Sequence, residues 1–153
     1  MTIILILTAV SLGIFAFQTA AAFLFGREQA GTSDSGRDWP MVSILKPMKS
    51  LDDEFRANLH SFMVLDYPRY EIVFGIDEPD DACAREARGL QARYPAVPQK
   101  VVVTGSEKRQ NPKIATLVPM AEHAAGGLLW ISDANTRVAP GVLKSLVREH
   151  LVS

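Results

Sequence analysis

The chain has 153 residues, a formal net charge of -1 and a hydrophobic content of 48%. This length is enough for one domain with a core of its own. The balanced charge gives no indication of nucleic-acid binding, and the single cysteine, Cys83, excludes an internal disulfide framework and a cysteine-rich zinc site.

The first predicted element is a membrane-spanning helix. No charged side chain occurs from Thr2 to Phe25, and a helix of this length measures roughly 36 Å, against about 30 Å for the hydrocarbon core of a bilayer. The alternative is a cleaved signal peptide in front of a secreted domain. We favour the anchor, because no basic residue precedes the apolar run and the run is long for a signal peptide.

The residues after this segment predict its orientation. Arg27 and Arg37 follow it, and no lysine or arginine precedes it, so the positive-inside rule predicts a single-pass membrane protein with its remaining part on the cytoplasmic side. We expect the anchor over residues 1–26 and a polar linker, rich in Gly, Ser and Asp, over 27–40. The domain itself is expected over 41–153.

Four strands, each followed by a helix, are predicted over this domain. The strands are expected at 41–45, 70–76, 100–104 and 128–131. Helices are expected at 50–63, 82–94 and 140–152, and another after Lys113 with Ile114, Leu117 and Val118 on one face. Pro47 is expected to end the first strand, and Pro119 to kink the third helix or cut it short. The alternation predicts an α/β fold, in which a parallel sheet carries helices on both faces.

The fourth predicted strand ends on an acid. The apolar run Leu128 to Ile131 follows Gly126-Gly127 and stops at Ser132-Asp133, which is typical of a buried central strand. Ligands of open parallel sheets bind beyond the carboxyl ends of the strands. We therefore interpret Asp133 as a residue that holds a divalent metal on a sugar nucleotide.

Polar residues follow the other three strands as well. They are Lys46 and Lys49 after the first, Asp77 to Asp81 after the second, and the loop Ser106 to Lys113 after the third. Parallel strands bring all of them to one edge of the sheet, where acids for a metal and lysines for phosphates suit a nucleotide diphosphate. Taken singly, the acidic run also fits a solvated turn that caps a helix, and the lysines fit ordinary surface.

Several segments of the domain together resemble a known family. From about Val42 to Val142 the sequence is similar to ceramide glucosyltransferases, and to the hopanoid-associated glycosyltransferases of bacteria. The matching segments are Lys46-Pro47-Met48-Lys49, Leu65-Asp66-Tyr67-Pro68-Arg69-Tyr70-Glu71, Asp80-Asp81, Asn111-Pro112-Lys113 and Ser132-Asp133-Ala134-Asn135-Thr136-Arg137-Val138.

The resemblance implies a GT-A (Rossmann-like) fold and an inverting transfer of a hexose from a UDP-sugar, with UDP-glucose expected, to ceramide or another lipid alcohol. Asp81, with Asp80 beside it, would contact the uridine part of the donor. Asp133 would bind Mg²⁺ or Mn²⁺ on the diphosphate. The remaining residues implied to line the nucleotide pocket are Lys46, Pro47, Asn111 and Lys113.

The sequence departs from the family pattern in two places. Asn135 stands where many metal motifs of the fold have a second acid, so Asp133 and Asn135 are the implied metal ligands. The later acid that serves the family as general base has no counterpart here, so we assign no catalytic residue and expect an incomplete N-terminal part that is inactive alone. The alternative is a non-catalytic, membrane-tethered module for nucleotide binding or interaction.

Overall fold

The computed structural model describes residues 38–49, 54–80, 82–105 and 110–152. Residues 38–153 form one compact unit, separate from residues 1–37. The predicted anchor and most of the predicted linker lie outside the described residues. Within those residues, no helix combines the length and the apolar composition that crossing a membrane requires.

The predicted alternation of strands and helices is confirmed. The strands are β1 (Val42–Pro47), β2 (Tyr70–Ile76), β3 (Gln99–Val103) and β4 (Leu128–Ile131). The helices are α2 (Phe55–Met63), α3 (Ala82–Arg93), α4 (Pro112–Glu122) and α5 (Val142–Val152). The strands form one sheet in the order β3-β2-β1-β4, and all three pairings are parallel.

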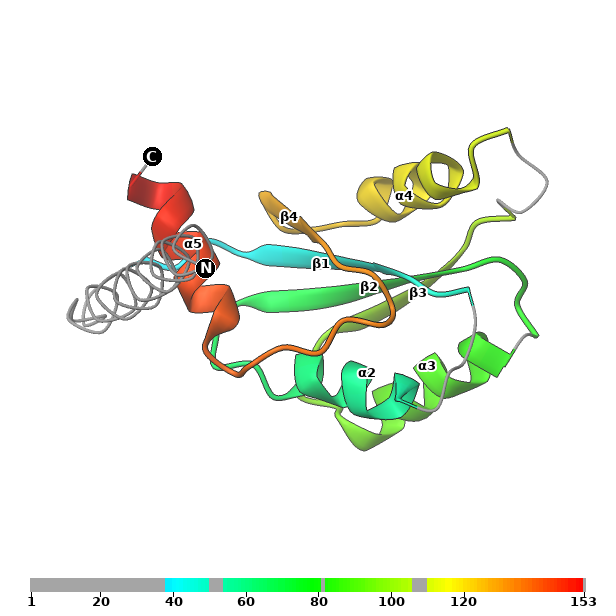
Figure 1. Cartoon of the computed structure of the whole chain (residues 1–153), viewed down its shortest axis with the longest axis horizontal. Helices are drawn as coiled ribbons and strands as arrows, with labels where there is room; N and C mark the ends of the chain where they lie inside the picture. Colours follow the sequence, from blue (N-terminus) through cyan, green and yellow to red (C-terminus); the bar gives the residue numbers. More distant parts are fainter. Residues whose placement is uncertain (1–37, 50–53, 81, 106–109, 153) are drawn as a thin grey trace, which may run out of the picture. The chain divides into compact units, whose positions relative to one another are not determined.

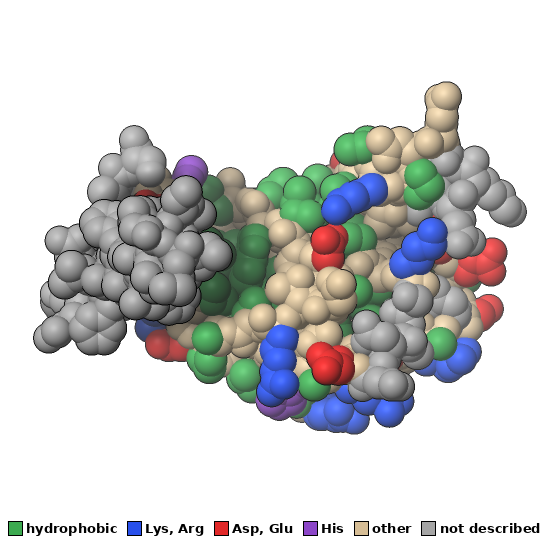
Figure 2. Space-filling view, viewed as in Figure 1, with side chains coloured by type: hydrophobic (Ala, Val, Ile, Leu, Met, Phe, Trp, Pro, Cys, Tyr) green, Lys and Arg blue, Asp and Glu red, His purple; other side chains and the backbone are tan. Residues whose placement is uncertain are grey.

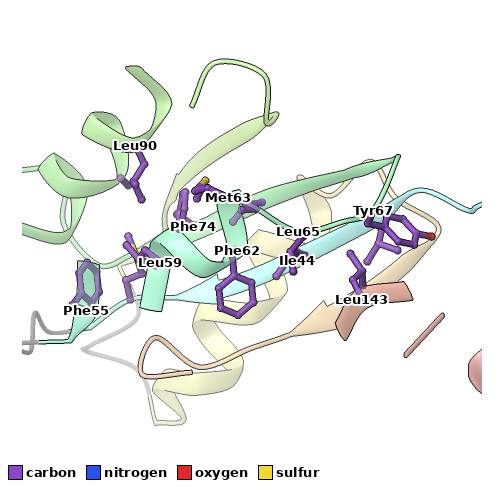
Figure 3. Close-up of a cluster of buried hydrophobic side chains, with 14 of the residues drawn as sticks. Ile44, Phe55, Leu59, Phe62, Met63, Leu65, Tyr67, Phe74, Leu90 and Leu143 are labelled. Carbon is purple, nitrogen blue, oxygen red and sulfur yellow. The ribbon is translucent and has the colours of Figure 1, made fainter. Parts of the chain in front are cut away.

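Helices lie on both faces of this sheet, as Figure 1 shows, with α2 and α3 below it and α4 above it. On the first face, Phe62 and Leu59 of α2 pack against Ile44 of β1 and Phe74 of β2, and all four are fully buried (Figure 3). On the second face, Met120 of α4 packs on Leu45 and Val73. The alternation of side chains along each strand distributes the apolar residues between the two layers.

Strand β1 ends at Pro47, as predicted, but it includes this proline, which pairs with Gly75, so the strand extends beyond the predicted 41–45. A proline is tolerated there because the ladder continues through the next amide, from Met48 N to Gly75 O at 2.8 Å. Helix α4 runs on past Pro119 to Glu122, so it is not cut short, and Met120 in its last turn is fully buried against the sheet.

The prediction that β4 is a buried central strand is wrong for the described sheet. β4 pairs only with β1 among the described residues, which places it at an edge. Its alternate side chains Leu129 and Ile131 are each 51% exposed, whereas Leu128 and Trp130 pack against the core. An apolar run of this kind indicates a strand, but its position in the sheet depends on its partners.

Candidate functional site

The carboxyl end of β4 and the start of α4 come together at one edge of the sheet. Lys113, on the first turn of α4, places Nζ 3.3 Å from Oδ1 of Asp133, which follows β4. Both side chains are 61% exposed, so the acid and the base face solvent as a pair. Figure 2 shows basic side chains beside acidic ones near the centre of the face in view. The predicted convergence is thus confirmed for Lys113 and Asp133.

Asn111 and Pro112 determine where α4 begins. The Asn111 side chain accepts a hydrogen bond from Ile114 N at 3.3 Å, and Pro112 occupies the first turn, where its missing N–H leaves no partner unsatisfied. The cap orients the first turn of α4, from which the Lys113 side chain reaches Asp133. Asn111, predicted to bind nucleotide, therefore has a structural role that sequence reasoning missed, although Asn before Pro is an N-cap signal.

Lys46 lies behind Asp133 and is fully buried, with 0% of the residue exposed. Its Nζ donates to the backbone carbonyl of Asp133 at 2.8 Å and lies 3.5 Å from Ser132 Oγ. Burial lowers the pKa of Lys46 to about 8, and the nearby negative charge of Asp133 acts in the opposite direction. The structure therefore brings Lys46 to the backbone of Asp133, as the common edge predicts.

The residues after Asp133 form a turn. Thr136 N donates to Asp133 O at 3.2 Å, and Asn135, the second implied metal ligand, lies exposed within the turn. In the part of the chain that the structure describes, no group of three or more His, Cys, Asp or Glu side chains could hold a metal ion. Among these described residues, an ion beside the turn would be held by the Asp133 carboxylate and neutral oxygen atoms.

The acidic run follows β2, which lies two strands away from β4 in the sheet. Asp80 is exposed, and its backbone carbonyl accepts a hydrogen bond from Arg85 Nη1 at 2.8 Å. Asp81 lies outside the described residues. Pro47 is half-buried at the end of β1, the strand that lies between β2 and β4 in the sheet. A role in nucleotide binding thus stays a prediction for all three residues.

A second polar network, which sequence reasoning missed, lies at the amino ends of the strands, opposite the carboxyl edge that carries Asp133. Glu71 is 2% exposed, and its Oε1 accepts from Ser43 Oγ and from Ala125 N, both at 2.6 Å. Its Oε2 pairs with Lys100 Nζ at 3.0 Å, and Ser43 Oγ accepts from Gly126 N at 2.8 Å. The network ties the connection between α4 and β4 to the sheet. The available signal was an acid inside an otherwise apolar strand.

The motif Asp66-Tyr67-Pro68 also serves the fold. Tyr67 Oη donates to Pro40 O at 2.6 Å, and the Tyr67 ring packs edge-on against Trp39 with centroids 5.4 Å apart. Asp66 N donates to Pro140 O at 2.8 Å, while its carboxylate pairs with Lys144 at 2.8 Å. These contacts connect the end of the α2 segment to the start of the α5 segment, away from Asp133.

Two solved structures have a similar fold. A mannosyltransferase from Pyrobaculum calidifontis, solved in complex with GDP-Man and Mn²⁺, superposes with a TM-score of 0.61 at 22% identity, over 92% of this chain and 43% of that one. TarS of S. aureus, residues 1–349, superposes with a TM-score of 0.56 at 18% identity, over 71% of this chain and 31% of that one. At such identities the likeness shows the fold, a GT-A-like parallel α/β sheet.

Curated relatives are similar in sequence over most of the domain. The chain is 30% identical to the ceramide glucosyltransferase of Candida albicans over 127 residues, which is 75% of this chain and 23% of that protein. It is 33% identical to ceramide glucosyltransferase 3 of Caenorhabditis elegans over 95 residues, which is 62% of this chain and 21% of that protein. The chain thus spans less than a quarter of these relatives. Because its residues 1–151 match glycosyl transferase family 21, the chain belongs to that family, which is the family of the ceramide glucosyltransferases.

Proposed function

We propose that this chain is the donor-binding part of a glycosyltransferase that moves a hexose from a UDP-sugar to a lipid hydroxyl of the ceramide type. Membership of family 21 supports the transfer, and relatives named ceramide glucosyltransferases support UDP-glucose and ceramide as its substrates. The observation that carries the proposal is the pair of Lys113 and Asp133, 3.3 Å apart at the carboxyl edge of a parallel sheet. That edge is where open α/β sheets bind nucleotides.

The residues at this edge fit a hard divalent cation that is shared with a diphosphate. Mg²⁺ and Mn²⁺ are commonly bound through one or two carboxylates, with water and phosphate oxygens completing the shell. The exposed Asp133 carboxylate, with the amide oxygen of Asn135, would hold such an ion. A bound ion would neutralise charge on the departing diphosphate. The P. calidifontis neighbour was solved with Mn²⁺, which agrees with this fit.

The chain's own groups would bind and orient the donor. Lys113 would exchange its contact with Asp133 for phosphate oxygens, and the start of α4 adds the partial positive charge of a helix N-terminus. Asp80 and Asp81 would contact the uridine part. We further propose that the apolar segment Thr2 to Phe25 anchors the domain on the cytoplasmic side of a membrane, next to a lipid acceptor.

The test is the binding of UDP to the full chain, measured by calorimetry with and without Mn²⁺. We expect binding that requires Mn²⁺ and that Asp133→Ala abolishes. Asp66→Ala is the matched control, because Asp66 is also an exposed acid paired with a lysine, 2.8 Å from Lys144, but lies away from the proposed site. Unchanged binding in that variant shows that the loss at Asp133 is specific.

Two results would count against the proposal. A folded wild-type chain that binds no UDP with Mn²⁺ would remove the donor site. UDP binding that neither Mn²⁺ nor Asp133→Ala changes would instead favour a nucleotide-binding module without metal-assisted transfer.

A further inference from the structure

Lys46 carries a charge in the interior of the domain. It belongs to β1, is fully buried, and its Nζ lies 3.8 Å from the centroid of the Phe62 ring. None of the ion pairs formed by the described residues includes Lys46. Burying an ammonium without a paired carboxylate is unfavourable, and an apolar side chain of similar volume would fit such a position at a lower cost. The contacts of the ammonium must therefore explain why a lysine stands there.

These contacts are with the backbone that carries Asp133. Nζ of Lys46 donates to Asp133 O at 2.8 Å, and the same oxygen accepts from Thr136 N at 3.2 Å. A carbonyl oxygen has two lone pairs, so both are used, one by β1 and one by the turn itself. Ser132, between β4 and Asp133, continues the ladder through its amide to Leu45 O at 3.0 Å. The last ladder bond between β4 and β1 is the one from Ser132 N to Leu45 O. The Lys46 ammonium adds a connection to β1 one residue later, at Asp133 O.

We infer that Lys46 is a positioning residue, which fixes the turn from Asp133 to Thr136 so that the Asp133 carboxylate is held in place for its cation and diphosphate. The ligand in this inference rests on the proposed function, whereas the hydrogen bond to Asp133 does not. The family resemblance assigns Lys46 to the nucleotide pocket. In the structure its ammonium contacts the backbone behind the carboxylate.

Replacing Lys46 by methionine separates positioning from folding. Lys46→Met keeps the length and approximate volume of the side chain but removes the ammonium. Because a buried charge disappears, the melting temperature is expected to stay the same or to rise. Because the turn loses its connection to β1, the affinity for UDP with Mn²⁺ is expected to fall about tenfold or more, the range typical of residues that orient a metal ligand.

Lys100→Met is the matched control. Lys100 also belongs to the sheet, in β3, but it pairs with Glu71 at 3.0 Å at the opposite edge. The substitution removes the same charge from the chain. Since it leaves the buried Glu71 carboxylate without its cation, it is expected to lower the melting temperature and to leave UDP binding unchanged. The two variants should therefore show opposite patterns of stability and binding.

A third measurement reports the hydrogen bond directly. The sequence contains two Asp-Ala pairs, Asp81-Ala82 and Asp133-Ala134. Labelling aspartate carbonyls with ¹³C and alanine nitrogens with ¹⁵N yields two correlation peaks, of which Asp133→Asn removes one. We expect Lys46→Met to move the Asp133 carbonyl resonance, and the Asp81 peak to serve as an internal reference.

The full 153-residue chain is used throughout, in detergent micelles, with UDP and Mn²⁺ as the ligands. The inference is supported if Lys46→Met moves the Asp133 carbonyl, preserves the melting temperature and weakens UDP binding. It is overturned if the carbonyl does not move, if UDP binding is unchanged, or if the variant unfolds well below the wild type, which would make Lys46 a structural residue. A wild type that binds no UDP refutes the proposed function, and the carbonyl resonance and the melting temperature then decide the role of Lys46.

Discussion

Lys113 Nζ and Asp133 Oδ1 lie 3.3 Å apart, although the two residues are separated by 20 positions in the sequence and one lies in α4 while the other follows β4. Both side chains are 61% exposed. An exposed ion pair of this kind contributes only about 0.2–1 kcal/mol, so it is easily exchanged for other partners. Under the proposed function, a cation would replace the ammonium at the carboxylate, and the ammonium would then turn to a phosphate.

This exchange predicts opposite effects of Lys113→Gln on two ligands. Removing the competing ammonium is expected to strengthen the binding of Mn²⁺ alone, by up to about fivefold. Removing a charged donor from the diphosphate is expected to weaken the binding of UDP with Mn²⁺ about tenfold. Electron paramagnetic resonance measures free Mn²⁺, and calorimetry measures UDP. Lys144→Gln, which breaks the pair with Asp66, is the control and should change neither the affinity for Mn²⁺ nor the affinity for UDP. If Lys113→Gln lowers both affinities together, the exchange is contradicted.

Asn111 allows the cap of α4 to be tested separately from nucleotide binding. Asn111→Ala removes the hydrogen bond to Ile114 N, and is expected to lower the free energy of unfolding by about 1 kcal/mol. Asn111→Ser restores an N-cap without the amide, so it should recover stability. If Asn111 acts only as a cap, any loss of UDP binding in Asn111→Ala is also recovered in Asn111→Ser. Recovery of stability without recovery of binding would show that the amide contacts the nucleotide, as the family resemblance implies.

The order of elements and the common edge could be predicted because both follow from local patterns. Apolar periodicity indicates each strand and helix, and the parallel sense of the strands brings Lys113 and Asp133 to one edge. The spacing of Ile44 and Lys46 also places both on the same face of β1, which is a signal that Lys46 points into the core. The partner of its ammonium could not be read in this way, since Asp133 O belongs to a turn 87 positions away.

The place of β4 in the sheet could not be predicted from its own residues. Leu128 to Ile131 are apolar on both sides, which is typical of a central strand, yet Leu129 and Ile131 remain half exposed at the edge of the described sheet. Burial depends on what lies beside a strand, and that information is not local. Asn111 is the opposite case. Its role as the N-cap of α4 could have been predicted locally, because Asn directly before Pro is a signal for the start of a helix.

Glu71 makes the stability of the domain depend on pH. Burial, the largest single influence, raises the pKa of Glu71, but the hydrogen bonds from Ser43 and Ala125 and the pairing with Lys100 together lower it below its ordinary value of 4.5. Above pH 4.5 the ionised carboxylate therefore contributes its full stabilisation. As the pH falls through the lowered pKa, the unfolded chain takes up the proton more readily and this contribution is lost.

Glu71→Gln tests this dependence by urea unfolding from about pH 7 to about pH 3. At neutral pH the variant is expected to be less stable by roughly 2–3 kcal/mol, because Lys100 and two hydrogen-bond donors lose the charged acceptor that the buried carboxylate provides. The difference should shrink below pH 4.5. Glu86→Gln, which affects a pair with the exposed Arg56, should change stability far less than Glu71→Gln does at neutral pH. A difference between the Glu71 variant and the wild type that is constant across this range would contradict the assignment.

Two neighbouring glycines before β4 differ sharply in the space around them. A Cβ atom on Gly126 would lie 2.6 Å from Ser43 N and 2.8 Å from Met41 O, both of which are backbone atoms of the β1 segment. A Cβ atom on Gly127 would meet nothing within 4 Å. Backbone atoms in a ladder cannot move aside as a flexible side chain can, so the first position requires glycine and the second does not.

Gly126→Ala is therefore expected to destabilise the domain by about 3 kcal/mol or more, since the start of β4 must move away from β1 and the bond from Gly126 N to Ser43 Oγ at 2.8 Å must lengthen. Gly127→Ala should be neutral, or stabilising by up to about 1 kcal/mol, because it only restricts the unfolded chain. Chemical denaturation of both variants measures the difference. Because β4 carries Asp133 at its other end, Gly126→Ala should also weaken UDP binding, whereas Gly127→Ala should not. Equal stability of the two variants would show that Gly126 does not lie against the backbone of Met41 and Ser43 as the structure has it.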